Sequence, residues 1–214
     1  MSASRGQLIT LEGGEGAGKS TVLAALETFL HEQGVDILRT REPGGTPAGE
    51  AIRAVLLDRA LTLCAQSELL LMFASRAQLV DEVVAPALAA GRWVLADRFT
   101  DASYAYQGAG RGLDPGWIAE LERRVVGVRP DLTLWLDLPV ETGLQRARQR
   151  GGEADRIESE RVEFFERVRD GYARLAAADP ARVVRIDAAQ SAEQVAADAV
   201  RAIRRRWFSE RARA

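Results

Sequence analysis

Three residue types that build many active sites are almost absent from this chain. Among 214 residues there is one lysine, Lys19, one histidine, His31, and one cysteine, Cys64. A single cysteine excludes an internal disulfide framework and a cysteine-based zinc cluster, and a single histidine excludes a multi-histidine metal site. We expect His31 to be a solvated surface residue and Cys64 a buried structural thiol. No Cys–His or Ser–His nucleophile pair is evident, so we expect no covalent enzyme intermediate.

Net charge and long apolar runs are also lacking. The formal net charge is -2, so no basic field points to nucleic acid or to an anionic membrane. No uninterrupted apolar stretch reaches membrane-spanning length, and the opening stretch MSASRGQLIT lacks the apolar run of a secretory signal. We therefore predict a cytoplasmic protein with neither nucleic acid nor a membrane as partner.

Short apolar segments and helical patterns alternate along the chain. Five segments have the apolar, β-branched character of buried strands: 7–13, 35–40, 92–98, 131–137 and 182–187. Helical spacing fills the intervals 20–34, 67–91, 114–126, 140–149, 158–178 and 191–207. We expect Pro86 to kink or divide the longest of these helices. Strands separated by helical crossovers predict one α/β domain over residues 1–214, with a five-stranded parallel sheet flanked by helices.

The stretch GGEGAGKS, residues 13–20, connects the first predicted strand to the first predicted helix. It fits the pattern G-x-x-x-x-G-K-[ST] of a phosphate-binding loop, in which backbone N–H groups and a helix N-terminus face one anion. We expect Lys19 to reach the β- and γ-phosphates of a nucleoside triphosphate, and the Ser20 hydroxyl to bind Mg²⁺. The predicted ATP-binding residues are Gly13, Gly14, Glu15, Gly16, Ala17, Gly18, Lys19, Ser20 and Thr21.

The isolated lysine supports this interpretation. Every other residue counted as lysine or arginine is an arginine. A guanidinium is planar and wider than an ammonium, so arginine would not fit the small concavity that the loop encloses. The loop predicts a nucleoside triphosphate site, but alone it does not choose between transfer to water, transfer to a small molecule and a mechanical switch.

Charged residues stand at the carboxyl ends of two further predicted strands, where open α/β sheets bind ligands. Arg41 suits a monophosphate because its guanidinium can contact two oxygens. Asp97 is placed to hold magnesium through its water shell, and Arg98 to lie between donor and acceptor, where charge spreads over the transferring group. The alternatives are a solvated turn around Arg41 and an ordinary ion pair at the end of the strand.

Three motifs extend the phosphate loop into a family pattern. REPGGT (41–46), DRFTDASYAYQGAGR (97–111) and DRIE (155–158) follow it in that order. Together the four motifs closely resemble those of bacterial thymidylate kinases, and the resemblance runs over nearly the whole chain. It implies a three-layer P-loop NTPase fold and transfer of the γ-phosphoryl group of MgATP to dTMP, which gives ADP and dTDP. It also implies a homodimer, formed through the helix around 67–91.

The resemblance further implies which residues bind dTMP. Residues at the positions of Phe73 and Arg76 stack on the thymine ring and bond its edge, whereas Leu70 and Met72 are expected to be core packing. Arg76 lies inside an apolar pattern and needs a buried partner. For Glu15 the resemblance implies contact with the acceptor sugar hydroxyl or its water shell, and exposure to solvent is the alternative. The predicted dTMP-binding residues are Glu15, Arg41, Phe73, Arg76, Arg98, Ser103, Tyr106 and Gln107.

The arginine-rich segment 145–158 resembles the mobile lid of these kinases. Arg146 and Arg150 are expected to share a helix face, with Arg148 offset from both. The phosphate loop contains no arginine, so we expect at least one of the three to meet the transferring phosphate when the lid closes. Which one does so stays open, and a solvated charged helix is the alternative. The predicted catalytic residues are Lys19, Arg98, Arg146, Arg148 and Arg150.

Two other functions are open at this point. One is a kinase of the same architecture for another nucleoside monophosphate or for a deoxynucleoside. The other is an ATP-dependent switch or assembly ATPase, which would need no arginine-lined acceptor site and would hydrolyse ATP slowly without a monophosphate.

Overall fold

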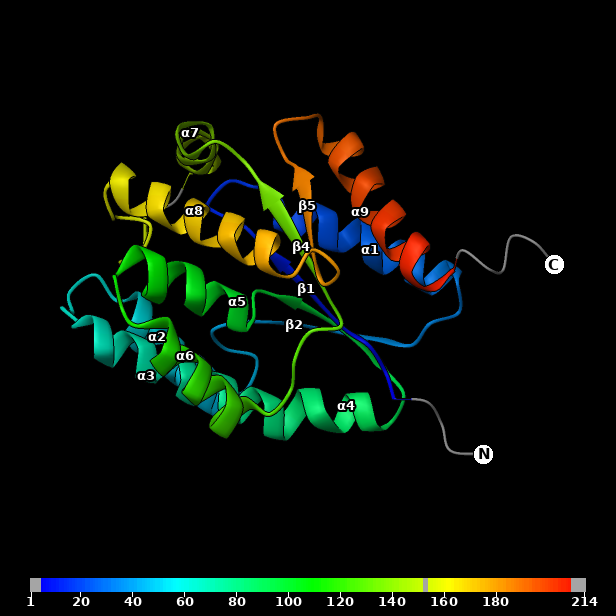
Figure 1. Ribbon diagram of the computed structural model, residues 1–214, viewed down its shortest axis with the longest axis horizontal. Coiled ribbons are helices and arrows are strands. Elements are labelled where there is room, and N and C mark those ends of the chain that lie inside the picture. The colour runs from blue at the N-terminus through cyan, green and yellow to red at the C-terminus, as the bar shows by residue number, and fades with distance from the viewer. Residues whose placement is uncertain (1–4, 152–153, 209–214) are drawn as a thin grey trace.

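A parallel sheet forms the centre of the protein (Figure 1). The structure is a computed structural model that describes residues 5–151 and 154–208. Within these residues the sheet has five strands in the spatial order β2-β3-β1-β4-β5, and each neighbouring pair is parallel. The strands are β1 (Leu8–Glu12), β2 (Ile37–Arg41), β3 (Trp93–Asp97), β4 (Leu132–Asp137) and β5 (Val183–Asp187). The predicted five-stranded parallel sheet is confirmed.

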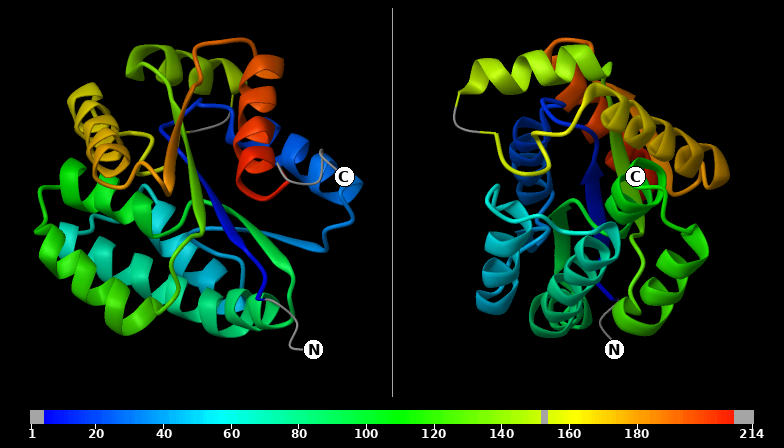
Figure 2. Two further views of the ribbon diagram at one scale, coloured as in Figure 1. Left: turned by 45° about the vertical axis from the view of Figure 1, so that its right-hand side comes forward. Right: turned by 90° about the vertical axis from the view of Figure 1, so that its left-hand side faces the viewer.

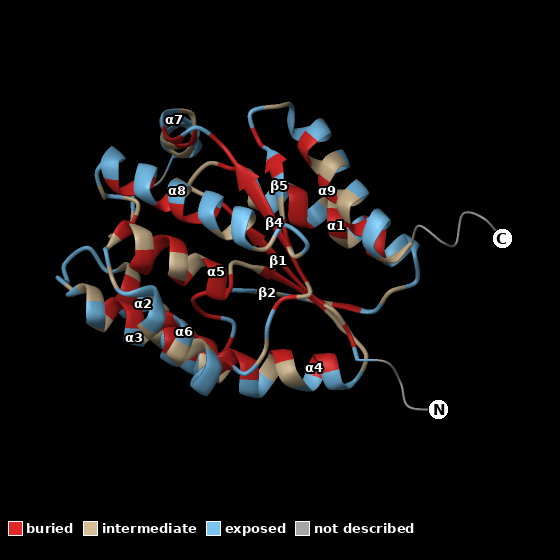
Figure 3. Ribbon diagram, viewed as in Figure 1, coloured by how far each residue is buried: buried red, intermediate tan, exposed pale blue. Residues whose placement is uncertain are grey.

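Burial separates the central strands from the edge strands (Figure 3). Every residue of β1 and β4 is buried, as expected for parallel strands covered on both faces. The edge strands β2 and β5 contain exposed positions as well. The buried residues at the carboxyl ends of β1 and β4 are carboxylates, Glu12 and Asp137, so the core ends in polar groups at that edge of the sheet.

Helices cover both faces of the sheet and give three layers (Figure 2). On one face α1 (Lys19–Glu32) and α9 (Ala192–Trp207) share a core with β1 and β4 that includes Leu23, Leu26 and Ile203. The other face carries a second core, to which α3, α4 and α6 contribute, and α8 packs along the segment that follows β3. These elements are α3 (Ala65–Leu79), α4 (Ala85–Ala89), α6 (Pro115–Leu121) and α8 (Val162–Ala178).

The long helix predicted at 67–91 is continuous. Between α3 and α4 lies a π-helical segment, η1 (Val80–Val84), whose flanking residues keep right-handed helical dihedrals. Pro86 is the second residue of α4 and does not divide the helix, because the wider π turn shifts the hydrogen-bond register where proline lacks a donor. Within the described residues no helix combines the length and apolar character needed to cross a bilayer.

Two helical regions were not predicted from the pattern. Helix α2 (Pro47–Leu57) follows the turn-rich stretch, and its start has clear signals, since Thr46 caps it by accepting from the Gly49 amide and Pro47 is its first residue. Helix α5 (Thr100–Ser103) continues into η2 (Tyr104–Gly110) directly after β3. Both regions lie at the carboxyl edge of the sheet and supply residues to the site. The remaining elements are η3 (Glu122–Val126) and α7 (Val140–Arg150).

Candidate active site

The phosphate loop connects β1 to α1 as the sequence predicts. Gly13, Gly16 and Gly18 have φ angles of 139°, 68° and 87°, values that L side chains rarely adopt. Lys19 is the first residue of α1, and its ammonium donates to the carbonyls of Gly13 and Gly14, both at 3.4 Å. The lysine therefore lies folded over the loop that it follows in sequence.

Helix α7 packs directly on this loop, and two glycines make the contact possible. A Cβ added to Gly16 would come within 2.2 Å of the Gly143 carbonyl oxygen, and one added to Gly143 within 2.4 Å of the Glu15 carbonyl oxygen. Neither position has room for a side chain, because both obstacles are backbone atoms. Gly143 was not predicted as a site residue, although a glycine inside a helical pattern is the signal that indicates such a close approach.

A cavity of about 440 Å³ opens between the loop and the carboxyl ends of β2 and β3. Its wall includes most of the phosphate loop, from Glu15 to Ser20, and residues from α2, α3, η2 and α7. Gly13, Gly14 and Thr21 are not among its lining residues, although the carbonyls of the two glycines hold Lys19. The predicted residues that line the cavity are Glu15, Gly16, Ala17, Gly18, Lys19, Ser20, Arg41, Arg76, Asp97, Arg98, Ser103, Tyr106, Gln107, Arg146 and Arg150.

Arg98 joins the end of β3 to the phosphate loop. Its φ of 70° is the only positive value at a non-glycine residue in the described part of the chain. The guanidinium donates to the Gly13 carbonyl at 2.8 Å and to the Glu15 carboxylate at 2.9 Å, and it lies 4.8 Å from the centre of the Tyr106 ring. An unusual backbone conformation thus places a cation against the loop.

Glu15 faces the cavity rather than bulk solvent. Besides Arg98 it accepts a hydrogen bond from the Tyr106 hydroxyl at 3.3 Å. Burial would raise the pKa of Glu15, but the charges of Arg98 and Lys19 outweigh it and hold that pKa below its ordinary value. An ionised carboxylate beside a phosphate site can bind a hydroxyl or a water, but it repels a phosphate.

Asp97 and Ser20 fit a magnesium ion bound with nucleotide phosphates. The Asp97 Oδ1 atom is buried and has no hydrogen-bond partner among the described residues. Both side chains line the same cavity. A carboxylate oxygen without a partner and a hydroxyl are the few protein groups that Mg²⁺ takes beside substrate phosphates. Within residues 5–151 and 154–208 no group of three or more His, Cys, Asp or Glu could hold a metal by itself.

A buried ion pair forms the acceptor end of the cavity. Arg76 is 1% exposed, and its Nε donates to Glu42 Oε2 at 2.7 Å. Its terminal nitrogens donate to the Ser103 hydroxyl at 3.0 Å and to the Phe99 carbonyl at 3.2 Å. Glu42 is therefore the partner that a buried arginine requires. Since each terminal nitrogen carries two hydrogens, these contacts leave one N–H of each for other acceptors.

Phe73 and Met72 differ in whether they line the cavity. Phe73 is 2% exposed and is not among the residues that line the cavity, and its ring lies under the Arg76 guanidinium at 4.7 Å. Met72, expected to be packing, lines the cavity. Leu70, also expected in the core, is 50% exposed. Met72 also packs against the core cluster that contains Tyr106 and Phe164, so its predicted packing role is confirmed, and stacking of Phe73 on the base stays a prediction.

Two arginines of the β2–α2 region border the cavity. Arg41 forms an exposed ion pair with Glu50 at 3.0 Å. Arg53, on α2, lines the same cavity and donates to the Pro43 carbonyl at 2.9 Å. Arg53 was not predicted as a site residue, because the turn-rich sequence before α2 hid the helix that carries it.

Helix α7 separates its three arginines as predicted. Arg146 and Arg150 line the main cavity, whereas Arg148 lines a neighbouring hollow bordered by residues 160–163. Arg146 donates to the Ala188 carbonyl at 3.1 Å, and Arg150 pairs with Glu158 at 3.2 Å. Of the predicted lid segment, residues 152 and 153 lie outside the described residues.

Two further residues differ from expectation. Cys64 is exposed at the start of α3, next to the Ser67 hydroxyl at 3.2 Å, so it is not the buried thiol that was predicted. Glu12, for which the sequence predicted no role, lies buried at the end of β1, where its carboxyl group accepts from the Tyr172 hydroxyl and from the Phe99 amide, each at 2.7 Å. Burial, the largest cause, and nearby Asp101 raise the pKa of Glu12 to about 8. A charged residue at the end of an apolar strand was the signal for it.

Comparison with known proteins places the whole chain in one family. The family model described as "Thymidylate kinase" matches residues 11–199. A thymidylate kinase of Alkalilimnicola ehrlichii is 54% identical over 211 residues, which are 96% of this chain and 97% of that protein. The chain belongs to the thymidylate kinase family. Membership in it makes the chain a nucleoside monophosphate kinase, a phosphotransferase.

Other relatives agree with this assignment. A thymidylate kinase of Pseudomonas savastanoi pv. phaseolicola is 57% identical over 196 residues, 90% of this chain and 92% of that protein. The crystal structure of thymidylate kinase from Ehrlichia chaffeensis matches with a TM-score of 0.76 at 30% identity and covers 94% of this chain and 99% of that chain. The predicted three-layer P-loop fold is confirmed by this likeness.

Proposed function

We propose that the chain transfers the γ-phosphoryl group of ATP to dTMP and releases ADP and dTDP. The observation that carries this proposal is the single cavity that has a phosphate loop at one end and a buried arginine at the other. A switch protein would have no use for the second end. Family membership supports the same reaction.

The donor phosphates would bind the loop from Gly13 to Ser20. Lys19 would exchange its weak contacts with the Gly13 and Gly14 carbonyls, both 3.4 Å long, for the β- and γ-phosphates. Mg²⁺ would be held by Asp97 and Ser20 together with the phosphates, and it would neutralise charge on them. Lys19 and Mg²⁺ would thus replace water around the phosphates by fixed positive charge.

The acceptor would bind at the other end, with its base toward Arg76 and its phosphate toward Arg98. Arg41 and Arg53 border the space between these ends and can contact the acceptor phosphate. Met72 lines the wall of the cavity, and Phe73, whose ring lies under the Arg76 guanidinium, stays the predicted stacking partner of the base. Glu15 would accept from the sugar hydroxyl or from its water.

Transfer would be direct and in line. Arg98 lines the cavity and contacts the phosphate loop, so its positive charge can stabilise the negative charge on the transferring phosphoryl group. Arg146 and Arg150, which line the main cavity, would add positive charge there, and Arg148, which lines the neighbouring hollow, would contribute less. Glu12 would help hold the Arg98 backbone through the Phe99 amide. The role of residues 145–158 as a lid stays a prediction.

We also propose a homodimer. Supporting it, three large apolar residues on or near α3 are exposed: Leu70 at 50%, and Leu61 and Val125 at 40% each. The helices α3 and η3 that carry two of them are packed on the same side of the sheet. Association through this face would remove these side chains from water. Sedimentation equilibrium would show a species of twice the 23.3 kDa chain mass, and a monomer at every concentration would contradict the proposal.

A panel of acceptors tests the proposed reaction. Steady-state kcat/KM is measured for dTMP, dUMP, dCMP and dGMP with MgATP, using chromatographic detection of the diphosphate. We expect dTMP to be preferred over dCMP and dGMP by about 10²-fold or more, because a buried polar site rejects a base that leaves its groups unpaired. Preference for another monophosphate would replace dTMP as the acceptor, and no diphosphate with any of them would refute the kinase.

A further inference from the structure

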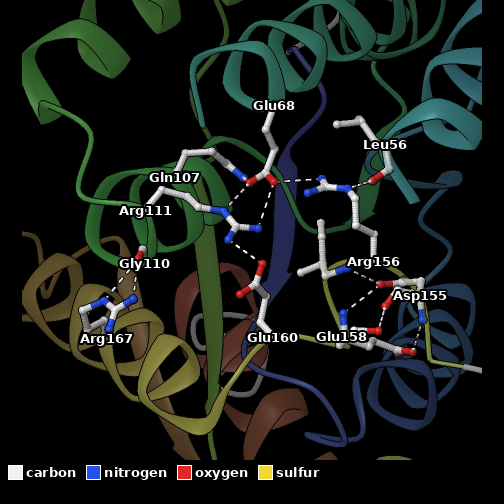
Figure 4. A network of polar contacts seen from close by, with 12 residues as sticks. Leu56, Glu68, Gln107, Gly110, Arg111, Asp155, Arg156, Glu158, Glu160 and Arg167 are labelled. Atoms are coloured by element: carbon white, nitrogen blue, oxygen red, sulfur yellow. Dashed lines mark hydrogen bonds and ion pairs between the residues drawn. The ribbon is translucent and has the colours of Figure 1, made fainter. Parts of the chain in front are cut away.

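Another buried carboxylate, Glu68, is the centre of a network of polar contacts that includes the cavity-lining residue Gln107 (Figure 4). Glu68 is 1% exposed in α3 and takes hydrogen bonds from three side chains. Gln107 donates its amide nitrogen to Oε1 at 2.9 Å. Arg111 contacts both carboxylate oxygens, at 3.2 and 3.0 Å, and Arg156 donates to Oε2 at 2.8 Å. Gln107 lies in η2, Arg111 directly follows η2, and Arg156 lies in the segment between α7 and α8.

These contacts keep Glu68 ionised. Burial by itself would raise the pKa of Glu68, but the hydrogen bonds from Arg111 and Gln107 and the charge of Arg111 outweigh burial and lower it. Arg111 also pairs with Glu160 at 2.5 Å, so the two guanidiniums in this network are balanced by two carboxylates. An ionised carboxylate has no proton to donate and can only accept hydrogen bonds.

The charge state of Glu68 fixes the orientation of Gln107. A primary amide can turn either its nitrogen or its oxygen toward a neighbour, and only the nitrogen can bond to a carboxylate. With the nitrogen held by Glu68, the oxygen is the polar atom that Gln107 can present elsewhere. Gln107 lines the cavity that Arg76 also lines. The acceptor end therefore offers a carbonyl oxygen from one residue and N–H groups from the other.

We propose that Glu68 is a positioning residue that makes the acceptor site select keto pyrimidines over amino pyrimidines. The proposal rests on the proposed function. Thymine presents an oxygen at C4 and an N–H at N3, which complement the N–H groups of Arg76 and the oxygen of Gln107. Cytosine presents the reverse pattern, an amino group at C4 and an acceptor nitrogen at N3. Glu68 sets this polarity without touching the base, since it acts through Gln107.

Replacing Glu68 by glutamine removes the fixed polarity at nearly unchanged shape. A glutamine at this position can accept or donate, so Gln107 can turn over and offer its nitrogen to cytosine. For Glu68→Gln we expect the ratio of kcat/KM for dTMP to that for dCMP to fall about tenfold, through KM rather than kcat. KM for ATP is expected to stay within about twofold, because the phosphate loop is not part of this network. The ratio of two acceptors is independent of the fraction of folded enzyme.

Glu160→Gln is the matched control. It removes a carboxylate from the same Arg111 but has no contact with Gln107. We expect its selectivity to equal that of the wild type. If the dTMP-to-dCMP selectivity of Glu160→Gln fell as far as that of Glu68→Gln, the effect would come from the loss of charge balance, and the proposal would be overturned.

A double-mutant cycle shows whether Glu68 acts through Gln107. Gln107→Met removes both ends of the amide, and in this background Glu68→Gln is expected to change the selectivity no further. A further fall in the double variant would overturn the proposal. Thermal unfolding shows whether Glu68→Gln folds; if it does not, Glu68→Asp keeps the charge but withdraws it by one methylene, and the same fall in selectivity is expected.

Failure of this inference is distinct from failure of the proposed function. Unchanged selectivity in Glu68→Gln, with turnover of dTMP retained, overturns the role of Glu68 and leaves the kinase intact. A wild-type enzyme that makes no dTDP overturns the proposed function itself, and with it the ground of the inference.

Discussion

Glu12 and Glu68 are both buried, yet their environments shift their pKa values in opposite directions. Glu12, directly before the phosphate loop, takes hydrogen bonds from a tyrosine hydroxyl and a backbone amide, and its pKa is raised to about 8. Glu68, beside Gln107 of the acceptor side, is contacted directly by two guanidiniums and an amide, and its pKa is lowered. Burial favours the neutral acid in both, and at Glu68 the hydrogen bonds from Arg111 and Gln107 together with the charge of Arg111 outweigh it.

The difference reflects how the two ends of the cavity are built. The phosphate side is built largely from backbone groups and glycines. Its two cations, Lys19 and Arg98, contact carbonyls of the loop and line the cavity that would hold the ligand. The acceptor side is made of side chains that satisfy one another before any ligand arrives, as Arg76 does with Glu42. Substitutions on the phosphate side should change turnover, and substitutions on the acceptor side should change stability and acceptor recognition.

The largest effect is expected from Lys19→Arg, because it tests the phosphate side at its centre. The guanidinium keeps the charge but is too wide for the loop, so we expect kcat/KM to fall by at least about 10³-fold, the scale of a cation that meets a transferring phosphate. Initial rates of dTDP formation measure it, and thermal unfolding should show a fold close to that of the wild type. A variant with more than a tenth of wild-type activity would contradict this.

Arg76→Met tests the acceptor side by leaving Glu42 buried without its cation. We expect the free energy of unfolding to fall by about 3–5 kcal/mol, measured by urea denaturation, and KM for dTMP to rise more than KM for ATP. Arg39→Met is the control, since it breaks the exposed pair with Glu27 and should cost less than about 1 kcal/mol. Equal decreases in the free energy of unfolding of the two variants would contradict the expectation that a buried ion pair contributes more than an exposed one.

Gly143→Ala tests whether close backbone contact with α7 shapes the phosphate loop. A glycine-to-alanine change inside a helix normally stabilises by about 0.5–1 kcal/mol. Here the new Cβ would meet the Glu15 carbonyl at 2.4 Å, so we expect destabilisation by about 1–3 kcal/mol and a higher KM for ATP. A stabilised variant with unchanged KM for ATP would show that the loop and α7 can separate without loss.

The pH dependence of stability tests the raised pKa of Glu12. The folded protein keeps a proton on this group up to pH of about 8, whereas an unfolded glutamate releases it near 4.5. Unfolding therefore releases a proton between these values, and stability falls as pH rises, by up to about 1.4 kcal/mol per pH unit. Glu12→Gln mimics the neutral acid and should flatten this slope in urea titrations from pH 5 to pH 8. An identical slope in the variant would refute the assignment to Glu12.

The smallest effect is expected from Arg148→Ala. Arg148 lines the hollow beside α7 rather than the main cavity, so we expect kcat/KM to change less than about threefold. Arg146→Ala and Arg150→Ala remove cations from the cavity wall and should each lower kcat by more than about tenfold. A larger loss in Arg148→Ala than in the other two would reverse the assignment made from the structure.

Sequence patterns were sufficient where the determinants are local. The five strands and the phosphate loop were predicted from apolar runs and from one short motif, because each element carries its own signal within a few residues. Helix α2 was missed although Thr46 and Pro47 signal its start, since the surrounding glycines suggested only a turn. The ligand-facing side of the sheet followed from strand ends, which meet at one edge in any parallel sheet.

The acceptor side was predicted less well because its determinants are far apart in the chain. The partners of Arg76 are Glu42, Ser103 and the Phe99 carbonyl, and no local pattern connects them. Helical spacing around Arg76 leaves the rotation of α3 undetermined, so it did not predict that Leu70 is exposed or that Met72 lines the cavity. Likewise, nothing near Glu68 in sequence indicates that Gln107, Arg111 and Arg156 converge on it.

The most direct measurement is the stoichiometry of ADP and dTDP formed from MgATP in the presence and absence of dTMP. A cavity with a phosphate loop at one end and a complete acceptor site at the other predicts one dTDP for each ADP, and almost no ADP when dTMP is left out. Formation of ADP without dTDP, at the same rate with and without dTMP, would contradict it and would leave an ATPase whose second site has another purpose.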